Sequence, residues 1–237
     1  MNKKLLILLW SSLLVMLSGC MYPDEKLVQN QIPYQDQVES VQAAVMQFKE
    51  DNGGILPIKN SEENTPVYQK YLIDFNKISP KYIHEPPGNA FESGGVFQYV
   101  IVDAETNPTV KLFDLRLSEM ISELKLRIKV QGYPPYKEKL AEGIYTLDYE
   151  KLGYEEELFV ESPYTKQMLP FVINGEAEIF VDYRADIVAA LEKEELHYEP
   201  GEDIRNILLN DSVFVPAYSL PYTIDSDTKE PIFLLTN

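Results

Sequence analysis

The fold of this chain is best read from Leu147-Asp148-Tyr149-Glu150-Lys151-Leu152, which repeats the pattern of Ile73-Asp74-Phe75-Asn76-Lys77-Ile78. Both stretches consist of an apolar residue, Asp, an aromatic residue, a polar residue, Lys and an apolar residue. A looser third copy is Glu202-Asp203-Ile204-Arg205-Asn206-Ile207. This recurrence predicts a degenerate internal repeat, in which each copy belongs to one unit of supersecondary structure. The alternative is a chance similarity between unrelated segments.

An amphipathic helix is predicted ahead of each copy. Apolar residues recur every three or four positions from about Asp36, Leu117 and Asp186. Each pattern ends at a stretch that contains glycine and proline, which are residues that stop helices. We expect the side chains of Ser118 and Asp186 to cap the second and third helices at their N-termini.

An extended segment and then a hairpin are predicted after each copy. The hairpin strands are short apolar runs, and Asn174-Gly175 is a strong turn signal within the middle pair. The extended segments are 82–86, 159–163 and 214–218. The predicted strand pairs are 97–102 with 110–113, 171–173 with 177–181, and 222–224 with 232–235.

The fold class follows from the need to cover apolar surfaces. A small sheet has one apolar face and an amphipathic helix has an apolar stripe. Each unit buries both of these surfaces when its helix lies on its own sheet. We therefore predict an α+β fold of repeated units, each an amphipathic helix packed on a small antiparallel sheet. The predicted units are 36–116, 117–184 and a third, shorter unit at 185–237.

The N-terminus has the layout of a secretory signal peptide, with Lys3 and Lys4 ahead of an apolar run from Leu5 to Leu17. That run is too short to span a bilayer. It ends in Leu17-Ser18-Gly19-Cys20, which resembles the lipobox of bacterial lipoproteins. The resemblance implies cleavage after Gly19 and a diacylglyceryl group on Cys20. It predicts a signal peptide at 1–19 and a lipidated tether at 20–35, the alternative being a chance cysteine.

The charge of the chain restricts its partners. It has 38 acidic and 21 basic residues, so its formal net charge is −17. This charge argues against a nucleic-acid partner and against attachment to anionic lipid by charge alone. We expect the lipid to hold the protein on the extracytoplasmic side of the cell membrane, in contact with an envelope protein partner. One cysteine and two histidines are too few for a zinc finger or a disulfide framework.

Two further resemblances concern the folded part. Phe48-Lys49-Glu50-Asp51-Asn52-Gly53 ahead of Pro57, and Pro80-Lys81-Tyr82-Ile83 ahead of Phe97-Gln98-Tyr99, resemble the globular domain of type II secretion pseudopilins. The lipobox replaces their prepilin cleavage site, so no pilus is expected. As a whole, the chain resembles the YphF-type lipoproteins of bacilli. That resemblance implies a location in the cell envelope and no established activity.

Candidate functional residues are few. We find no common catalytic motif and no metal-ligand spacing, and we assign no cofactor. His84 and His197 lie in different units, and the acidic run Glu155-Glu156-Glu157 is either a solvated surface or a cation site. The six tyrosines between Tyr133 and Tyr164 suit a contact surface or a core. Asp182, Tyr183 and Arg184 form a possible recognition element.

An ion pair between Asp182 and Arg184 explains the same residues structurally, and the matching Asp114 and Arg116 favour that interpretation. We therefore predict a membrane-anchored lipoprotein that acts as a non-enzymatic binding or assembly module of the cell envelope. One alternative is a lipoprotein that binds an extracytoplasmic ligand or calcium. The other is an envelope hydrolase that uses paired carboxylates.

Overall fold

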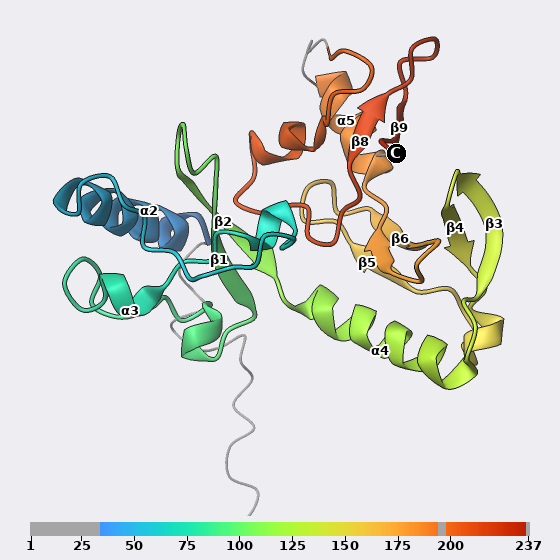
Figure 1. The fold of residues 1–237 in the computed structure, drawn as a ribbon, viewed down its shortest axis with the longest axis horizontal. Helices are drawn as coiled ribbons and strands as arrows, with labels where there is room; N and C mark the ends of the chain where they lie inside the picture. Colours follow the sequence, from blue (N-terminus) through green and yellow to red (C-terminus); the bar gives the residue numbers. More distant parts are fainter. Residues whose placement is uncertain (1–33, 194–197, 236–237) are drawn as a thin grey trace, which may run out of the picture. The chain divides into compact units, whose positions relative to one another are not determined.

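The computed structural model describes residues 34–193 and 198–235, which form a body of helices and short antiparallel sheets (Figure 1). This architecture confirms the predicted α+β class. The predicted lipid-attachment residue Cys20, the signal peptide, most of the tether and His197 lie outside the described residues. No helix within the described ranges combines the length and the apolar character needed to cross a membrane.

The first helix and hairpin pack on each other as the sequence predicts. Helix α2 (Tyr34–Asp51) covers the two-stranded sheet of β1 (Phe97–Val102) and β2 (Thr109–Asp114). Val41 and Val45 lie on the covered side of the helix and are fully buried. The helix begins two residues earlier than predicted, within the segment that we expected to be tether.

The middle of the chain forms a five-stranded sheet that shares its core with α4 (Arg116–Gln131). Leu124 of α4 is fully buried in that core, and the helix ends at Gly132, whose φ of +87° is a left-handed conformation that favours glycine. Strand β6 is central, because it pairs with β4, β5 and β7. The strands are β3 (Tyr136–Ala141), β4 (Ile144–Leu147), β5 (Phe159–Glu161), β6 (Met168–Asn174) and β7 (Ile179–Val181).

The last third of the chain is organised around α5 (Arg184–Lys193). This helix contacts the 3-10 helix η6 (Arg205–Leu209) and the second strand of a terminal hairpin. The hairpin consists of β8 (Tyr222–Ile224) and β9 (Pro231–Phe233). Ile187 anchors α5, since its side chain is fully buried in the same core as α4 and the middle sheet.

Each copy of the repeated stretch forms a single helical turn, namely α3 (Phe75–Ile78), η5 (Glu150–Leu152) or η6. The shared aspartates, Asp74, Asp148 and Asp203, each accept a hydrogen bond from a backbone N–H two or three residues further on. An acceptor at the start of a helical turn satisfies an N–H that has no partner inside it. The repeated Asp therefore accepts a backbone hydrogen bond near the start of the helical turn in all three copies.

Several local features differ from the sequence prediction. The hairpin of β3 and β4 was not predicted, and it turns at Gly143, whose φ is +70°. Segment 82–86 forms turns and not an extended strand. Ser118 does not cap α4: it lies inside the helix with its hydroxyl 2.6 Å from that of Tyr218, while Asp114 accepts the hydrogen bond from the N–H of Arg116.

The outer edge of β2 is paired with a segment from the end of the chain. The N–H of Leu112 donates to the carbonyl of Val213 at 2.7 Å, and the N–H of Val215 donates back to Leu112 at 3.0 Å. Beside this short parallel bridge, Lys111 Nζ donates to the carbonyls of Leu209 and Ser212. The first hairpin is therefore continued by residues that lie about 100 positions later in the sequence.

Candidate functional site

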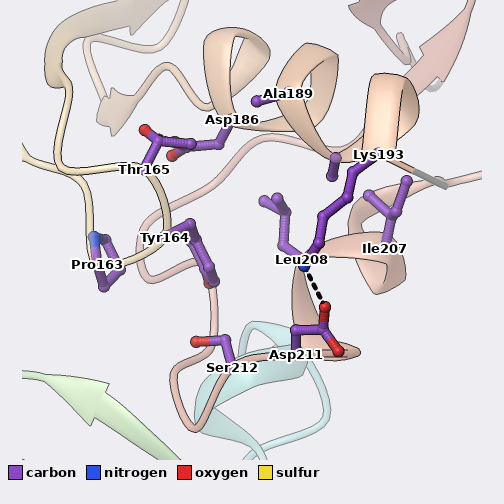
Figure 2. Close-up of a pocket in the computed structure, with 11 residues that line it drawn as sticks. Pro163, Tyr164, Thr165, Asp186, Ala189, Lys193, Ile207, Leu208, Asp211 and Ser212 are labelled. Carbon is purple, nitrogen blue, oxygen red and sulfur yellow. Dashed lines mark hydrogen bonds and ion pairs between the residues drawn. The ribbon is translucent and has the colours of Figure 1, made fainter.

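A pocket of about 290 Å³ opens between α5, η6 and the turn that joins β5 to β6 (Figure 2). Helix α5 contributes Asp186 and Lys193, which are two turns apart and therefore lie on one face of the helix. The full lining is Pro163, Tyr164, Thr165, Asp186, Ala189, Ala190, Lys193, Ile207, Leu208, Asp211 and Ser212.

One end of the pocket holds a buried carboxyl group, that of Asp186, which is only 1% exposed. Ser162 Oγ donates to its two oxygens at 2.8 and 2.9 Å, and Thr165 Oγ1 donates to Oδ1 at 2.6 Å. Burial raises the pKa of the Asp186 carboxyl, while the hydrogen bonds from Thr165 and Ser162 act to lower it. The predicted cap is therefore a link between α5 and the β5–β6 turn.

The turn itself is shaped around Ser162. Its Oγ accepts hydrogen bonds from the backbone N–H groups of Tyr164 and Thr165 while its hydroxyl proton goes to Asp186. The Tyr164 hydroxyl donates to the carbonyl of Phe214 at 3.4 Å, and burial raises the pKa of this phenol well above its ordinary value. Turn, helix and C-terminal segment are thus held in one fixed arrangement around the pocket.

The other end of the pocket is charged and open to water. Lys193 Nζ lies 2.5 Å from Asp211 Oδ2, and both side chains are more than two thirds exposed. The hydrogen bond from Lys193 lowers the pKa of the Asp211 carboxyl. Figure 2 shows this pair at the opposite end from Asp186 and Thr165, with Leu208 between them. The pocket therefore has a neutral or acidic inner end, apolar walls and a charged rim.

The predicted recognition element has a structural role. Tyr183 is 1% exposed and its hydroxyl donates to the carbonyl of Ala217, so its ring belongs to the core. Asp182 is 6% exposed and accepts hydrogen bonds from the N–H, Nε and Nη2 groups of Arg184 at 2.6 to 3.0 Å. These residues join β7 to α5, and two of the three present almost no surface to a partner.

The same Asp-x-Arg clamp occurs three times in the part of the chain that the structure describes. Asp114 binds Arg116 and Asp203 binds Arg205 with the same pattern of N–H, Nε and guanidinium donors. Each guanidinium also lies over an aromatic ring. The distance to the ring centroid is 5.6 Å from Arg116 to Phe97, 4.7 Å from Arg184 to Phe233 and 5.2 Å from Arg205 to Tyr68. The sequence contains all three pairs, but the third falls within the repeated stretch and was not recognised as a clamp.

The remaining candidates are dispersed. His84 is exposed, and Glu155, Glu156 and Glu157 are exposed, with Glu157 3.1 Å from Lys137. Within residues 34–193 and 198–235, no three His, Cys, Asp or Glu side chains converge as a metal site would require. The tyrosines between Tyr133 and Tyr164 do not all lie in one environment. Tyr149 is buried in the core, whereas Tyr133 is 56% exposed on the surface.

Sequence reasoning missed the group formed by Ser162, Thr165 and Asp186. The three residues come from a turn and a helix more than 20 positions apart, so no local spacing joins them. Ser162-Pro163-Tyr164-Thr165 has the composition of a turn whose hydroxyls bond to nearby backbone, which is the only signal available in the sequence. That signal indicates a turn but no partner for it.

An α+β protein with a small amphipathic pocket belongs to a broad class of proteins, and comparison with known proteins narrows this class for part of the chain. Residues 34–114 match the family model of the YphF family N-terminal domain. This match supports the predicted likeness to YphF-type proteins for the first helix and hairpin. No curated protein and no solved structure matches the chain. The pocket residues, from Pro163 to Ser212, lie outside the matched range.

Proposed function

We propose that this chain is a lipid-anchored protein of the cell envelope that acts as a non-enzymatic binding module on the extracytoplasmic side of the membrane. The apolar run and the stretch Leu17-Ser18-Gly19-Cys20 support the anchor. The match of residues 34–114 to the YphF family N-terminal domain supports the wider family resemblance. The binding part of the proposal rests on the pocket beside α5.

The proposal depends on one observation: the polar side chains of the pocket already have hydrogen-bond or ion-pair partners within the protein. Both oxygens of Asp186 accept hydrogen bonds from hydroxyl groups, and Lys193 is paired with Asp211. A general acid or base must exchange its proton with a substrate, and a buried carboxyl group held by two hydroxyl donors is poorly placed for that. Apolar walls with a few fixed polar groups are typical of ligand sites. We infer a small polar ligand with one apolar face.

Filling the pocket tests this proposal. Ala190 lines the pocket and Ala185 is exposed on the same helix outside it, so Ala190→Leu and Ala185→Leu form a matched pair. The probes are panels of monosaccharides, amino acids and dipeptides, and the measurement is the thermal midpoint. We expect at least one probe to raise the midpoint of the wild type and of Ala185→Leu, because a ligand of the native state stabilises it. A rise that persists in Ala190→Leu contradicts the site.

The anchor has its own test. Cys20→Ser removes the thiol that would receive the lipid, so we expect an unprocessed or released protein in place of a membrane-bound one. Cell fractionation and the mass of the mature chain measure this. Unchanged processing and membrane retention of Cys20→Ser would show that the cysteine is incidental.

A hydrolase is the second candidate, because one observation favours it. Asp186 and Asp211 line the same pocket, and a pair of carboxyl groups is what most glycoside hydrolases use. If they act on a glycan, hydrolysis should be measurable with the wild type and abolished in Asp211→Asn. Ligand binding without turnover decides for the binding module.

A further inference from the structure

A second pocket lies where the first hairpin meets the later part of the chain. It has a volume of about 280 Å³ and is lined by the 3-10 helix η3 (Val67–Gln69), the end of β2, helix α4, strand β7 and the segment ahead of β8. None of its lining residues belongs to the pocket beside α5. We call this second cavity the η3 pocket.

Aromatic side chains form much of the wall of the η3 pocket. The rings that line it are those of Tyr68, Phe113, Phe180 and Tyr218. Phe113 and Tyr218 meet edge to face, with 5.4 Å between their ring centroids. Aromatic side chains attract a further ring in the same edge-to-face geometry or in an offset stack. The wall therefore suits a ligand with an aromatic part.

Contacts inside the protein hold this wall in place. Tyr218 has a φ of +55°, which is a left-handed conformation that is uncommon for a large side chain. Its carbonyl accepts a hydrogen bond from the N–H of Val181 at 3.0 Å, and its hydroxyl lies 2.6 Å from that of Ser118. Because these contacts already order the wall, little conformational entropy is lost when a ligand binds.

Charged side chains of both signs line the η3 pocket. Lys125 and Glu178 are exposed, and neither has an ion-pair partner in the part of the chain that the structure describes. The Glu178 carboxylate accepts a hydrogen bond from the neutral amide of Asn174 at 3.3 Å. Arg205 also lines the pocket, but Asp203 compensates its charge, with 2.6 Å between Nη2 and Oδ2. An ammonium group and a carboxylate are therefore available to a ligand.

The size and the charges of the pocket together restrict the ligand. Sites for drug-sized molecules usually have volumes of about 300–1,000 Å³, so this pocket suits a molecule of the size of a single amino acid. A ligand with one charge would leave either Lys125 or Glu178 without a counter-charge. A neutral sugar could stack on the rings but would match neither charge. A zwitterion matches both.

We propose that the η3 pocket binds a zwitterionic aromatic amino acid. The ligand carboxylate lies at Lys125, its ammonium group lies at Glu178, and its ring packs against the aromatic wall. This second site goes beyond the proposed function and does not depend on the pocket beside α5.

Three related probes test the assignment: L-phenylalanine, N-acetyl-L-phenylalanine, which lacks the ammonium group, and L-phenylalanine amide, which lacks the carboxylate. Isothermal titration calorimetry with the full chain measures their affinities. The variants are Lys125→Met and Glu178→Gln, both at exposed positions where the fold tolerates the change. Lys129→Met and Glu176→Gln are the matched controls, because these residues are exposed nearby and do not line the pocket.

We expect phenylalanine to bind the wild type and both controls. Its affinity should fall about tenfold in Lys125→Met and in Glu178→Gln, because each change removes one charge-assisted contact. The wild type should bind the acetylated and the amidated probe about tenfold more weakly than phenylalanine. Lys125→Met should not weaken the binding of the amide further, since the amide has no carboxylate.

Three results overturn the proposal: no binding of phenylalanine to the wild type, equal affinities for the three probes, or equal losses in the pocket variants and their controls. Ala190→Leu, which fills the pocket beside α5, separates the two sites. Phenylalanine binding that persists in Ala190→Leu and is weakened in Lys125→Met supports the η3 pocket, so this probe does not count against the site beside α5. Binding lost in Ala190→Leu and kept in Lys125→Met supports the proposed function and overturns this inference.

Discussion

Asp186 is a carboxyl group that the fold keeps out of water, and this makes the stability of the protein depend on pH in a defined direction. Burial raises its pKa in the folded chain, so the folded state binds this proton more tightly than the unfolded state. Its contribution to stability is therefore largest below the ordinary pKa and is lost as the pH rises through the raised one. Asp211 has a lowered pKa, so its contribution is present at high pH and is lost in acid.

We predict opposite pH trends for Asp186→Asn and Asp211→Asn. Between about pH 7 and about pH 4, the free energy of unfolding of the wild type should rise relative to Asp186→Asn. Between about pH 4 and about pH 2, it should fall relative to Asp211→Asn, because the lowered pKa of Asp211 places this loss below the ordinary pKa of the group. Urea unfolding of the three proteins at these pH values measures these differences. The same sign for both variants would show that Asp186 is solvated in solution.

The Asp-x-Arg clamps allow a comparison of one interaction at two depths. The Asp182 and Arg184 side chains are 7% and 35% exposed, whereas those of Asp114 and Arg116 are 19% and 64% exposed. Removal of a buried partner leaves the other charge without compensation, while an exposed pair contributes little. We expect Asp182→Ala to lower the free energy of unfolding by about 2–3 kcal/mol and Asp114→Ala by less than about 1 kcal/mol. Equal losses in denaturant unfolding would contradict the depth argument.

At the scale of elements, Gln42 joins helix to sheet. Its Oε1 accepts a hydrogen bond from the N–H of Val110 at 2.6 Å, and its Nε2 donates to the carbonyl of Pro108 at 3.0 Å. The side chain thus provides hydrogen-bond partners for two backbone groups near the start of β2 that have no partner in the β1–β2 sheet.

Gln42→Ala should lower the free energy of unfolding by about 1–2 kcal/mol, because two partly buried backbone groups lose their partner. Gln35→Ala is the matched control, since Gln35 lies on the same helix and its amide reaches only the exposed Glu39. Chemical denaturation should leave the Gln35→Ala midpoint close to that of the wild type. If Gln42→Ala behaves in the same way, the link does not contribute to the docking of α2.

Those elements that the sequence predicted are the ones with strong local signals. The helix from Arg116 to Gln131 has regular apolar spacing and a glycine stop, and the hairpin of β1 and β2 has two long apolar runs. Strand β3 was missed because three exposed charged residues, Lys137, Glu138 and Lys139, interrupt its apolar character. The strand forms because β4 offers it a ladder, and that partnership is invisible in a local window.

The pocket could not be predicted for the same physical reason. Its inner end needs the β5–β6 turn to meet α5, and its rim needs Asp211 to meet Lys193, which are contacts between separate elements. The sequence does contain the polar residues, but their roles depend on burial. Asp186 illustrates this, because an exposed Asp in the first turn of a helix is a cap and a buried one links two elements.

At the scale of the whole molecule, the first helix and hairpin depend on the end of the chain. Phe214 lies 5.5 Å from Phe97 and 6.0 Å from Tyr34, measured between ring centroids. On the other side of β1 and β2, Val100 and Phe113 are buried in a cluster with Val215. The range that matches the YphF family N-terminal domain ends at residue 114, so it lacks both of these contacts.

We predict that a fragment of residues 34–114 does not fold cooperatively alone. Without the segment around Phe214, the edge of β2 loses its parallel partner, and Val100 and Phe113 become exposed. An apolar face and an open strand edge together favour association over a stable monomer. Thermal unfolding followed by circular dichroism, with size-exclusion chromatography, should show a broad transition and oligomers for the fragment but a sharp transition for the full chain. A monomeric fragment with a sharp transition would show that α2, β1 and β2 form an autonomous domain, and that the later pairing of Leu112 with Phe214 only docks it.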